Sequence, residues 1–265
     1  MANAIALVGD VHGHHHLMVS KVNALAAQAG VGIDLVVQVG DFEAHRHEDD
    51  LATMAAPQKY RTLGDFPDFY NGQAEFPWPV IFVGGNHEPY GWYDQYPEGH
   101  ELVKNCRYLG RVGGIEHRDI RIVGMSGVYS ERMFTSTRPP IGEIKTRSNK
   151  DYIGYSDHDV DAALTYDKCD LLVIHDWPGG MLQPEDHAQL PERWDVATLG
   201  NEYTELLIEA LEPSVVACGH MHFPFQKSMP LRSGDTVEVF CLDELKSSSG
   251  GIVLLDDALK KIEVG

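Results

Sequence analysis

The chain has 265 residues, of which 43% are hydrophobic, and a formal net charge of -19 at pH 7. This length suits one large α/β domain, and because no stretch is typical of a linker, we expect a single domain over residues 1–265. The acidic charge argues against binding of an extended nucleic-acid duplex, which usually requires a basic surface. The sequence shows no apolar run of membrane-spanning length and no signal-peptide pattern, so we expect a cytoplasmic protein that does not bind membranes.

Short apolar runs rich in valine and isoleucine predict strands that are buried on both faces. They cover residues 4–9, 34–40, 79–85, 170–175 and 214–220. Helical patterns lie at 14–30, 158–166 and 199–213, and the first ends in Gly30, a typical C-terminal cap. Polar and apolar residues alternate over 114–127, and over 235–244 and 250–264, with a serine-glycine turn at 247–251. The pattern predicts an α/β fold in which antiparallel hairpins close the sheets.

Residues 129–155 show little periodicity and are too long for a simple connection. Between residues 132 and 150 a single acid, Glu143, faces five basic residues: Arg132, Arg138, Lys145, Arg147 and Lys150. Long ordered loops often have a function, so we expect this basic segment to contribute to the activity.

Each of the five predicted strands is followed by a polar cluster. The clusters are GDVH at 9–12, GDFE at 40–43, GGNHE at 84–88, HDWP at 175–178 and GHMH at 219–222. Ligands of parallel sheets bind at the carboxyl ends of the strands, so we expect the clusters to converge on one crevice. Their candidate metal ligands are Asp10, His12, Asp41, Asn86, His175, His220 and His222.

Mixed oxygen and imidazole donors suit Mn, Fe or Zn, and this donor set is too large for one ion but right for two that share a carboxylate. Two divalent ions held by two aspartates and a hydroxide leave a small positive charge, which attracts a phosphate. Two such ions also lower the pKa of a shared water and clamp the oxygens of a displacement at phosphorus. The sequence therefore predicts hydrolysis of a phosphate ester at a binuclear metal site.

The motif set D-x-H, G-D, G-N-H-E, a later histidine and G-H-x-H resembles the calcineurin-like metallophosphoesterases over nearly the whole chain. The resemblance implies a sandwich of two β-sheets flanked by helices, with four layers in the order α/β/β/α. It places Asp10, His12 and His222 on a first metal, Asn86, His175 and His220 on a second, and Asp41 between them. It also implies that His87 contacts the scissile phosphate and assists the leaving oxygen, while Glu88 and Asp176 orient histidine ligands.

Other segments are similar to the catalytic domain of RNA lariat debranching enzymes, which hydrolyse a 2′,5′-phosphodiester at a branch point. They are residues 40–61, 80–88, 108–129 and 175–178. This resemblance implies a branched or short RNA as substrate and a recognition role for the loop 129–155. It also implies contacts from the loop for Tyr129 and Arg132, and base stacking for Tyr129, Tyr152 and Tyr155. We expect Lys59, Tyr60 and Arg61 to add contacts to phosphate, and the alternative is that they form the surface of a helix.

The chain departs from the eukaryotic debranching pattern in its first motif, where Asp10 stands in place of a cysteine. A carboxylate is a harder ligand than a thiolate, so we expect two divalent ions that are Mn, with Fe, Zn or Mg as alternatives.

The neighbouring His14, His15 and His16 have no place in the motifs, and we expect them to form an exposed helix start. The alternative is that His14 or His15 lines the substrate cleft.

Other functions remain open at this point. The acidic charge would suit a nucleotide or cyclic-nucleotide phosphodiesterase. A phosphoprotein phosphatase is less favoured. A scaffold without catalysis is also less favoured, because all seven ligands and His87 are present.

Overall fold

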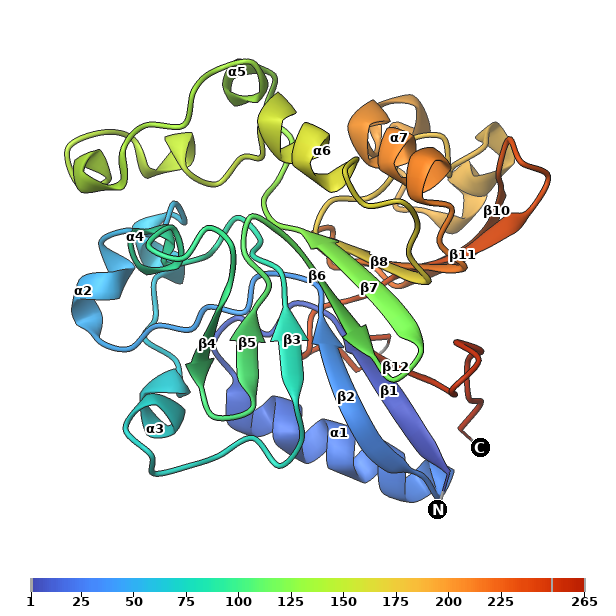
Figure 1. The fold of residues 1–265 in the computed structure, drawn as a ribbon, viewed down its shortest axis with the longest axis horizontal. Coiled ribbons are helices and arrows are strands. Elements are labelled where there is room, and N and C mark those ends of the chain that lie inside the picture. The colour runs from blue at the N-terminus through green and yellow to red at the C-terminus, as the bar shows by residue number, and fades with distance from the viewer. Residues whose placement is uncertain (1, 249, 265) are drawn as a thin grey trace.

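Two mixed six-stranded β-sheets pack face to face in the computed structural model, which describes residues 2–248 and 250–264 (Figure 1). In spatial order, the first sheet contains β12 (Ile252–Leu255), β1 (Asn3–Val8), β2 (Gly32–Gln38), β3 (Val80–Phe82), β5 (Cys106–Tyr108) and β4 (His100–Val103). The second contains β10 (Phe225–Pro230), β11 (Thr236–Cys241), β9 (Val215–Cys218), β8 (Leu171–Ile174), β7 (Ile120–Met125) and β6 (Val112–His117). The inner strands of each sheet are parallel, and the edge strands β12, β4, β10 and β6 are antiparallel to their neighbours.

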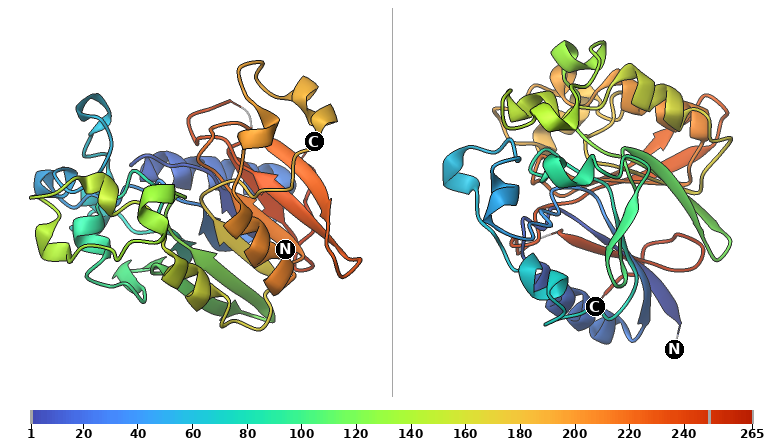
Figure 2. Two further views of the ribbon diagram at one scale, coloured as in Figure 1. Left: turned by 90° about the horizontal axis from the view of Figure 1, so that it is seen from above. Right: turned by 60° about the vertical axis from the view of Figure 1, so that its left-hand side comes forward.

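Helices cover the two outer faces of this sandwich, which confirms the predicted α/β/β/α layers (Figure 2). The α-helices are α1 (His15–Ala29), α2 (Glu48–Leu51), α3 (Phe66–Tyr70), α4 (Tyr90–Tyr93), α5 (Glu131–Phe134), α6 (Asp157–Ala163) and α7 (Glu202–Leu211). Short 3₁₀ turns are η1 (Gln58–Tyr60), η2 (Ile141–Glu143), η3 (Asn149–Asp151), η4 (Pro184–Gln189) and η5 (Val196–Thr198). Within the described residues, no helix combines the length and apolar character that crossing a membrane requires.

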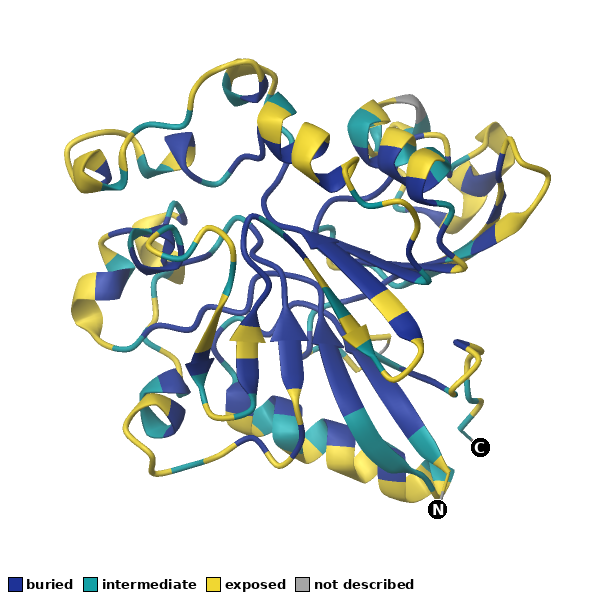
Figure 3. Ribbon diagram, in the orientation of Figure 1, coloured by how far each residue is buried: buried dark blue, intermediate teal, exposed yellow. Residues whose placement is uncertain are grey.

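The parallel strands are buried on both faces, as their continuous apolar runs predict (Figure 3). One hydrophobic cluster fills the space between the sheets and includes Leu7, Val37, Val173 and Ala217. Two further clusters lie outside it, one between the first sheet and α1 and the other between the second sheet and α6 and α7. The carboxyl ends of β1, β2, β3, β8 and β9 are thereby held as one rigid platform.

Helix α1 confirms the predicted stop at Gly30, which adopts a left-handed conformation with φ of 68°. The carboxylate of Asp65 accepts the backbone N–H groups of His15 and His16 at 2.7 and 3.2 Å, so a residue far along the chain satisfies two donors at the helix start. The side chain of His16 is exposed, as predicted, but that of His15 is fully buried. The prediction is wrong for His15 because its ring packs against Phe42 and its Nδ1 lies 3.0 Å from Asp65.

The two alternating segments have different outcomes. The first forms the antiparallel pair β6 and β7, as predicted. The second is not a hairpin, because β11 joins the second sheet beside β9 whereas β12 joins the first sheet beside β1. The chain therefore passes from the second sheet to the first between β11 and β12, and Ser249, within the expected turn, lies outside the described residues. Both flanks of β11 already have partners in β10 and β9, so β12 pairs with the free edge of β1 instead.

The segment 129–155 contains α5, η2 and η3, and its end is tied to the chain just after β7 by backbone hydrogen bonds of Val128 with Ile153 and Tyr155. Tyr152 and Tyr155 are 0% and 1% exposed, and their hydroxyls donate to Pro140 and Asn201 at 3.0 and 2.7 Å. The expectation that these two rings stack on bases is therefore wrong, because they anchor the loop. Part of its basic charge is also neutralised, since Arg132 pairs with Asp151.

Candidate metal centre

The strand ends carry several residues in a strained backbone conformation. Among the described residues, nine other than glycine have positive φ, and five of them belong to one cluster: His12 (47°), Asp41 (53°), Glu43 (55°), His220 (68°) and His222 (47°). Each such residue costs about 1–3 kcal/mol, and strain of this kind concentrates at functional sites. The chain turns sharply at the end of each strand and thereby directs the following side chain into a common space.

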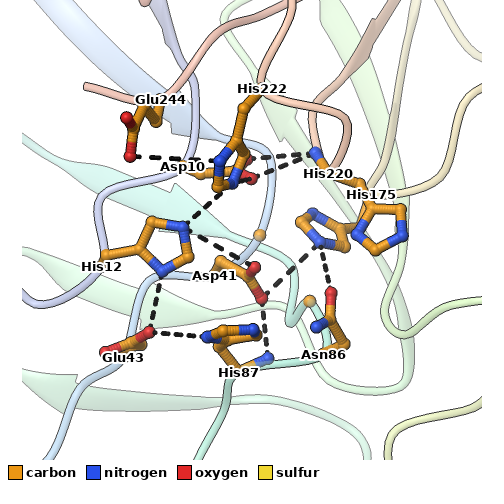
Figure 4. Close-up of polar contacts among 12 residues, drawn as sticks. Asp10, His12, Asp41, Glu43, Asn86, His87, His175, His220, His222 and Glu244 are labelled. Atoms are coloured by element: carbon orange, nitrogen blue, oxygen red, sulfur yellow. Dashed lines mark hydrogen bonds and ion pairs between the residues drawn. The ribbon is translucent and has the colours of Figure 1, made fainter. Parts of the chain in front are cut away.

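The first donor group comprises Asp10, His12, Asp41 and His222, whose donor atoms all lie within 4.8 Å of one another (Figure 4). Nε2 of His12 lies 3.1 Å from Nε2 of His222, which in turn lies 3.0 Å from Oδ2 of Asp10. Two imidazole nitrogens and two carboxylates this close together suit a divalent cation, because the ion satisfies all four donors at once.

The second group lies on the other side of Asp41. Nε2 of His175 is 3.3 Å from Oδ1 of Asn86 and 3.6 Å from Oδ1 of Asp41. The ring centroids of His220 and His175 lie 4.9 Å apart. The backbone N–H of His220 donates to the carboxylate of Asp10. The structure thus gathers all seven predicted ligands, with Asp41 between the two groups.

The charges of the two groups are strongly coupled. Burial lowers the pKa of His12, but the contacts with Glu43 and Asp41 outweigh burial and raise this pKa to about 9. Burial also lowers the pKa of His175, but the charge of Asp41 chiefly outweighs it and raises this pKa to about 10. Burial likewise raises the pKa of Asp41, and His175 outweighs it and holds that pKa well below its ordinary value. A metal ligand must be deprotonated, so metal binding at this site would release protons from these rings.

Glu43 is a candidate functional residue that sequence reasoning did not single out. Its buried carboxylate lies 2.8 Å from Nδ1 of His12 and 3.3 Å from Nδ1 of His87. The backbone N–H of His87 donates to Oδ1 of Asp41 at 2.7 Å, which fixes the residue beside the first donor group. The signal available in the sequence was its position in the cluster GDFE, two residues after a predicted ligand.

Glu88 and Asp176 have different roles. Glu88 accepts the backbone N–H groups of Phe42, Glu43 and Gly85 and forms no hydrogen bond or ion pair with a histidine among the described residues, so the expectation that it orients a ligand is wrong. It holds two strand-end turns together, and burial with the nearby Asp41 raises its pKa to about 7. Asp176, in contrast, has Oδ1 4.0 Å from Nε2 of His220 and accepts the backbone N–H of Tyr129.

A cleft of about 510 Å³ opens beside the first donor group and His87. It is lined by His14, Lys59, Tyr60, Thr62, Glu244 and Lys246 among others, so two of the predicted substrate contacts and the alternative placement of His14 agree with the structure. Arg61, Tyr129 and Arg132 do not line this cleft. Arg61 donates to Ala56 instead, Tyr129 packs against Tyr203, and Arg132 reaches Asp151.

Comparison with known proteins agrees with this geometry. A family model described as calcineurin-like phosphoesterase matches residues 4–224. The lariat debranching enzyme of Arabidopsis thaliana is 30% identical over 247 residues, which cover 89% of this chain and 58% of the relative. The lariat debranching enzyme of Saccharomyces cerevisiae is 32% identical over 237 residues, which cover 85% of this chain and 58% of the relative. The chain therefore spans 58% of the length of each of these two proteins.

Proposed function

The chain belongs to the calcineurin-like phosphoesterase family, and from this we propose that it hydrolyses a phosphodiester with two divalent metal ions. The observation that carries the proposal is the convergence of seven donor side chains with Asp41 between the two groups. Asp10, His12 and His222 would hold the first ion, and Asn86, His175 and His220 the second. When bound, the two ions supply a hydroxide at neutral pH and neutralise charge on the phosphate oxygens.

His87 is the candidate general acid of this site. It lies in the cleft beside the first donor group, and Nδ1 is turned toward Glu43, so Nε2 is the ring nitrogen that remains for the substrate. Burial lowers the pKa of His87, but the hydrogen bond to Glu43 and the charge of Asp41 outweigh it and raise this pKa above its ordinary value. A raised pKa favours the protonated ring, and a protonated ring can donate to a leaving oxygen.

We propose that the substrate is a short or branched RNA with a 2′,5′ linkage. The two relatives described above are lariat debranching enzymes. In the cleft, the ring of Tyr60 is 53% exposed and carries the ammonium of Lys59 at 4.5 Å from its centroid. Lys59 and Lys246 form no ion pair with the described carboxylates, so both ammonium groups are available for phosphates beyond the scissile one. An exposed ring beside cations suits an unpaired base and its phosphate.

A nucleotide or cyclic-nucleotide phosphodiesterase is the second candidate. A net charge of -19 repels long RNA, and a cleft of about 510 Å³ is large enough for a nucleotide. For the metals we propose Mn, because Asp10 offers the first ion a hard carboxylate oxygen.

The test is hydrolysis, with added Mn, of a small branched RNA that contains one 2′,5′ linkage. Its linear 3′,5′ counterpart, cyclic nucleotides and bis-p-nitrophenyl phosphate serve as parallel substrates, and Asp41→Asn serves as the variant with a damaged metal site. We expect the wild type to cleave the branch in preference to the linear linkage. Preferential cleavage of cyclic nucleotides would support the second candidate, and failure to cleave any of these diesters would refute the proposed function.

A further inference from the structure

Glu43 is a buried carboxylate that the metal ligand set does not include, and it lies between two rings with different tasks (Figure 4). The same oxygen, Oε1, is 2.8 Å from Nδ1 of His12 and 3.3 Å from Nδ1 of His87. The side chain is 2% exposed, and the backbone N–H of Glu43 donates to Glu88 at 2.8 Å. Both the backbone and the carboxylate of this residue are therefore fixed.

We propose that Glu43 is a positioning residue, which holds the metal ligand His12 and the proton donor His87 through their Nδ1 atoms so that both Nε2 atoms face the reaction centre. This inference rests on the proposed phosphodiester hydrolysis. Metal-binding histidines usually donate their second N–H to a carboxylate, which sets the orientation of the ring. Here one carboxylate does so for a ligand and for the proton donor together.

The proton balance of the reaction explains why His87 requires this contact. As the oxygen of the attacking water or hydroxide forms its bond to phosphorus, the bond from phosphorus to the leaving oxygen breaks. The electron pair of the broken bond stays on the leaving oxygen, which takes the proton from Nε2 of His87. The ring is then neutral, and its remaining proton lies on Nδ1, where Glu43 accepts it. Glu43 thus stabilises the product tautomer as well as the orientation of the ring.

A third metal ion held by the donor atoms of His12, Glu43 and His87 is the competing interpretation, because these atoms also lie within 4.8 Å of one another. In that case His12 would bind metals through both ring nitrogens and would have to lose both of its ring protons. The hydrogen bond from Nδ1 to Glu43 is the simpler arrangement. Metal analysis distinguishes the two, with two ions per chain expected and three contradicting the proposal.

The kinetic test compares leaving groups. Methyl p-nitrophenyl phosphate releases a phenoxide that needs no proton, whereas a 2′,5′-linked dinucleotide releases an alkoxide that does. The substitution Glu43→Ala should slow dinucleotide hydrolysis about 10- to 100-fold, the usual cost of losing a residue that orients a functional side chain, and change nitrophenyl hydrolysis much less. In a His87→Asn background the same substitution should change the ratio of the two rates no further, because the two residues act as a unit.

Glu75→Ala is the control, since Glu75 is exposed, pairs with Lys104 at 2.7 Å and does not line the cleft. It should leave the ratio of the two rates unchanged. An unchanged ratio in Glu43→Ala would overturn the proposal. If the wild type itself hydrolysed neither substrate, that result would instead refute the proposed function.

A second readout needs no activity. In ¹⁵N-histidine spectra of the metal-free protein, at a pH where the rings are neutral, we expect the wild type to carry the His87 proton on Nδ1. Glu43→Gln keeps an acceptor oxygen and should retain this tautomer, whereas Glu43→Ala should lose it. Persistence of the Nδ1 tautomer in Glu43→Ala would contradict the positioning role even if the protein proved to have a different substrate.

Discussion

At the residue scale, the candidate metal centre requires glycine at two positions, because a Cβ atom there would collide with the proposed metal ligands. A Cβ atom on Gly85 would lie 2.3 Å from Oδ1 of Asp41 and 2.6 Å from Nε2 of His175, the two residues at the middle of the site. A Cβ on Gly40 would lie 2.3 Å from Nδ1 of His175, and Gly40 also has a φ of 117°. Glycine is needed here because backbone and ligands approach one another closely.

We predict that Gly85→Ala weakens metal binding about tenfold or more, because the methyl group displaces Asp41 and His175 from their shared position. Overpacking of this kind also costs about 1–3 kcal/mol of unfolding free energy. Titration with Mn by calorimetry and urea unfolding measure the two effects. Gly142→Ala is the control, since a Cβ there meets nothing within 4 Å. Unaltered Mn affinity in Gly85→Ala would contradict the close approach described here.

At the element scale, the start of α1 determines where the cleft lies. The backbone N–H of Asp65 donates to Gly13 at 2.9 Å, and a Cβ on Gly64 would meet Gly13 O at 2.5 Å, so the segment that carries Lys59 is pressed against the first motif. His15 strengthens this contact with a hydrogen bond to Asp65. The other ring nitrogen, Nε2, has no partner, which suits a neutral ring that donates only from Nδ1.

Removal of His15 should change how stability depends on pH. Burial outweighs the hydrogen bond to Asp65 and holds the pKa of His15 below its ordinary value of 6.5. Below pH 6.5 the unfolded chain therefore binds a proton that the folded chain does not, and the stabilisation by neutral His15 is lost as the pH falls. As the pH falls from 8 to 5, the wild type should therefore lose unfolding free energy relative to His15→Leu, by up to about 1.4 kcal/mol per pH unit. Urea unfolding at a series of pH values, in the presence of a chelator, measures it, and a constant difference would contradict the assignment.

At the scale of the whole molecule, the metal centre joins the two sheets. Asp10, Asp41 and Asn86 follow β1, β2 and β3 of the first sheet, whereas His175 and His220 follow β8 and β9 of the second. Ions that bind both sets of side chains would link the sheets at their carboxyl ends.

Mn should therefore stabilise the folded protein, and a chelator should reverse the effect. At a free Mn concentration of 100 times the dissociation constant, the gain is about 2.7 kcal/mol for one site, which corresponds to a rise in Tm of several degrees. Thermal unfolding followed by circular dichroism measures the shift. His222→Ala should show a smaller gain because it lacks a ligand of the first ion, and an equal gain in both proteins would contradict the assignment of that ligand.

Much of the fold was predictable from local pattern. The apolar runs that form β1, β2, β3, β8 and β9, and the polar residues that follow each of them, are adjacent in the sequence. The placement of Asp10 and His12 after a strand needs no tertiary information, because a buried strand must end in a turn at the surface. The pattern failed for β12, since a strand of a given composition can pair with any available edge.

The sequence by itself determined which side chains stand at the strand ends, because the order of the chain places each motif directly after its apolar run. Only the tertiary structure decided that Glu43 lies between His12 and His87, that His15 is buried against Phe42, and that Lys246 reaches the cleft. These outcomes depend on residues at least 27 positions apart in the chain, which are brought together by how the two sheets and their crossing segments pack, and no local periodicity encodes them.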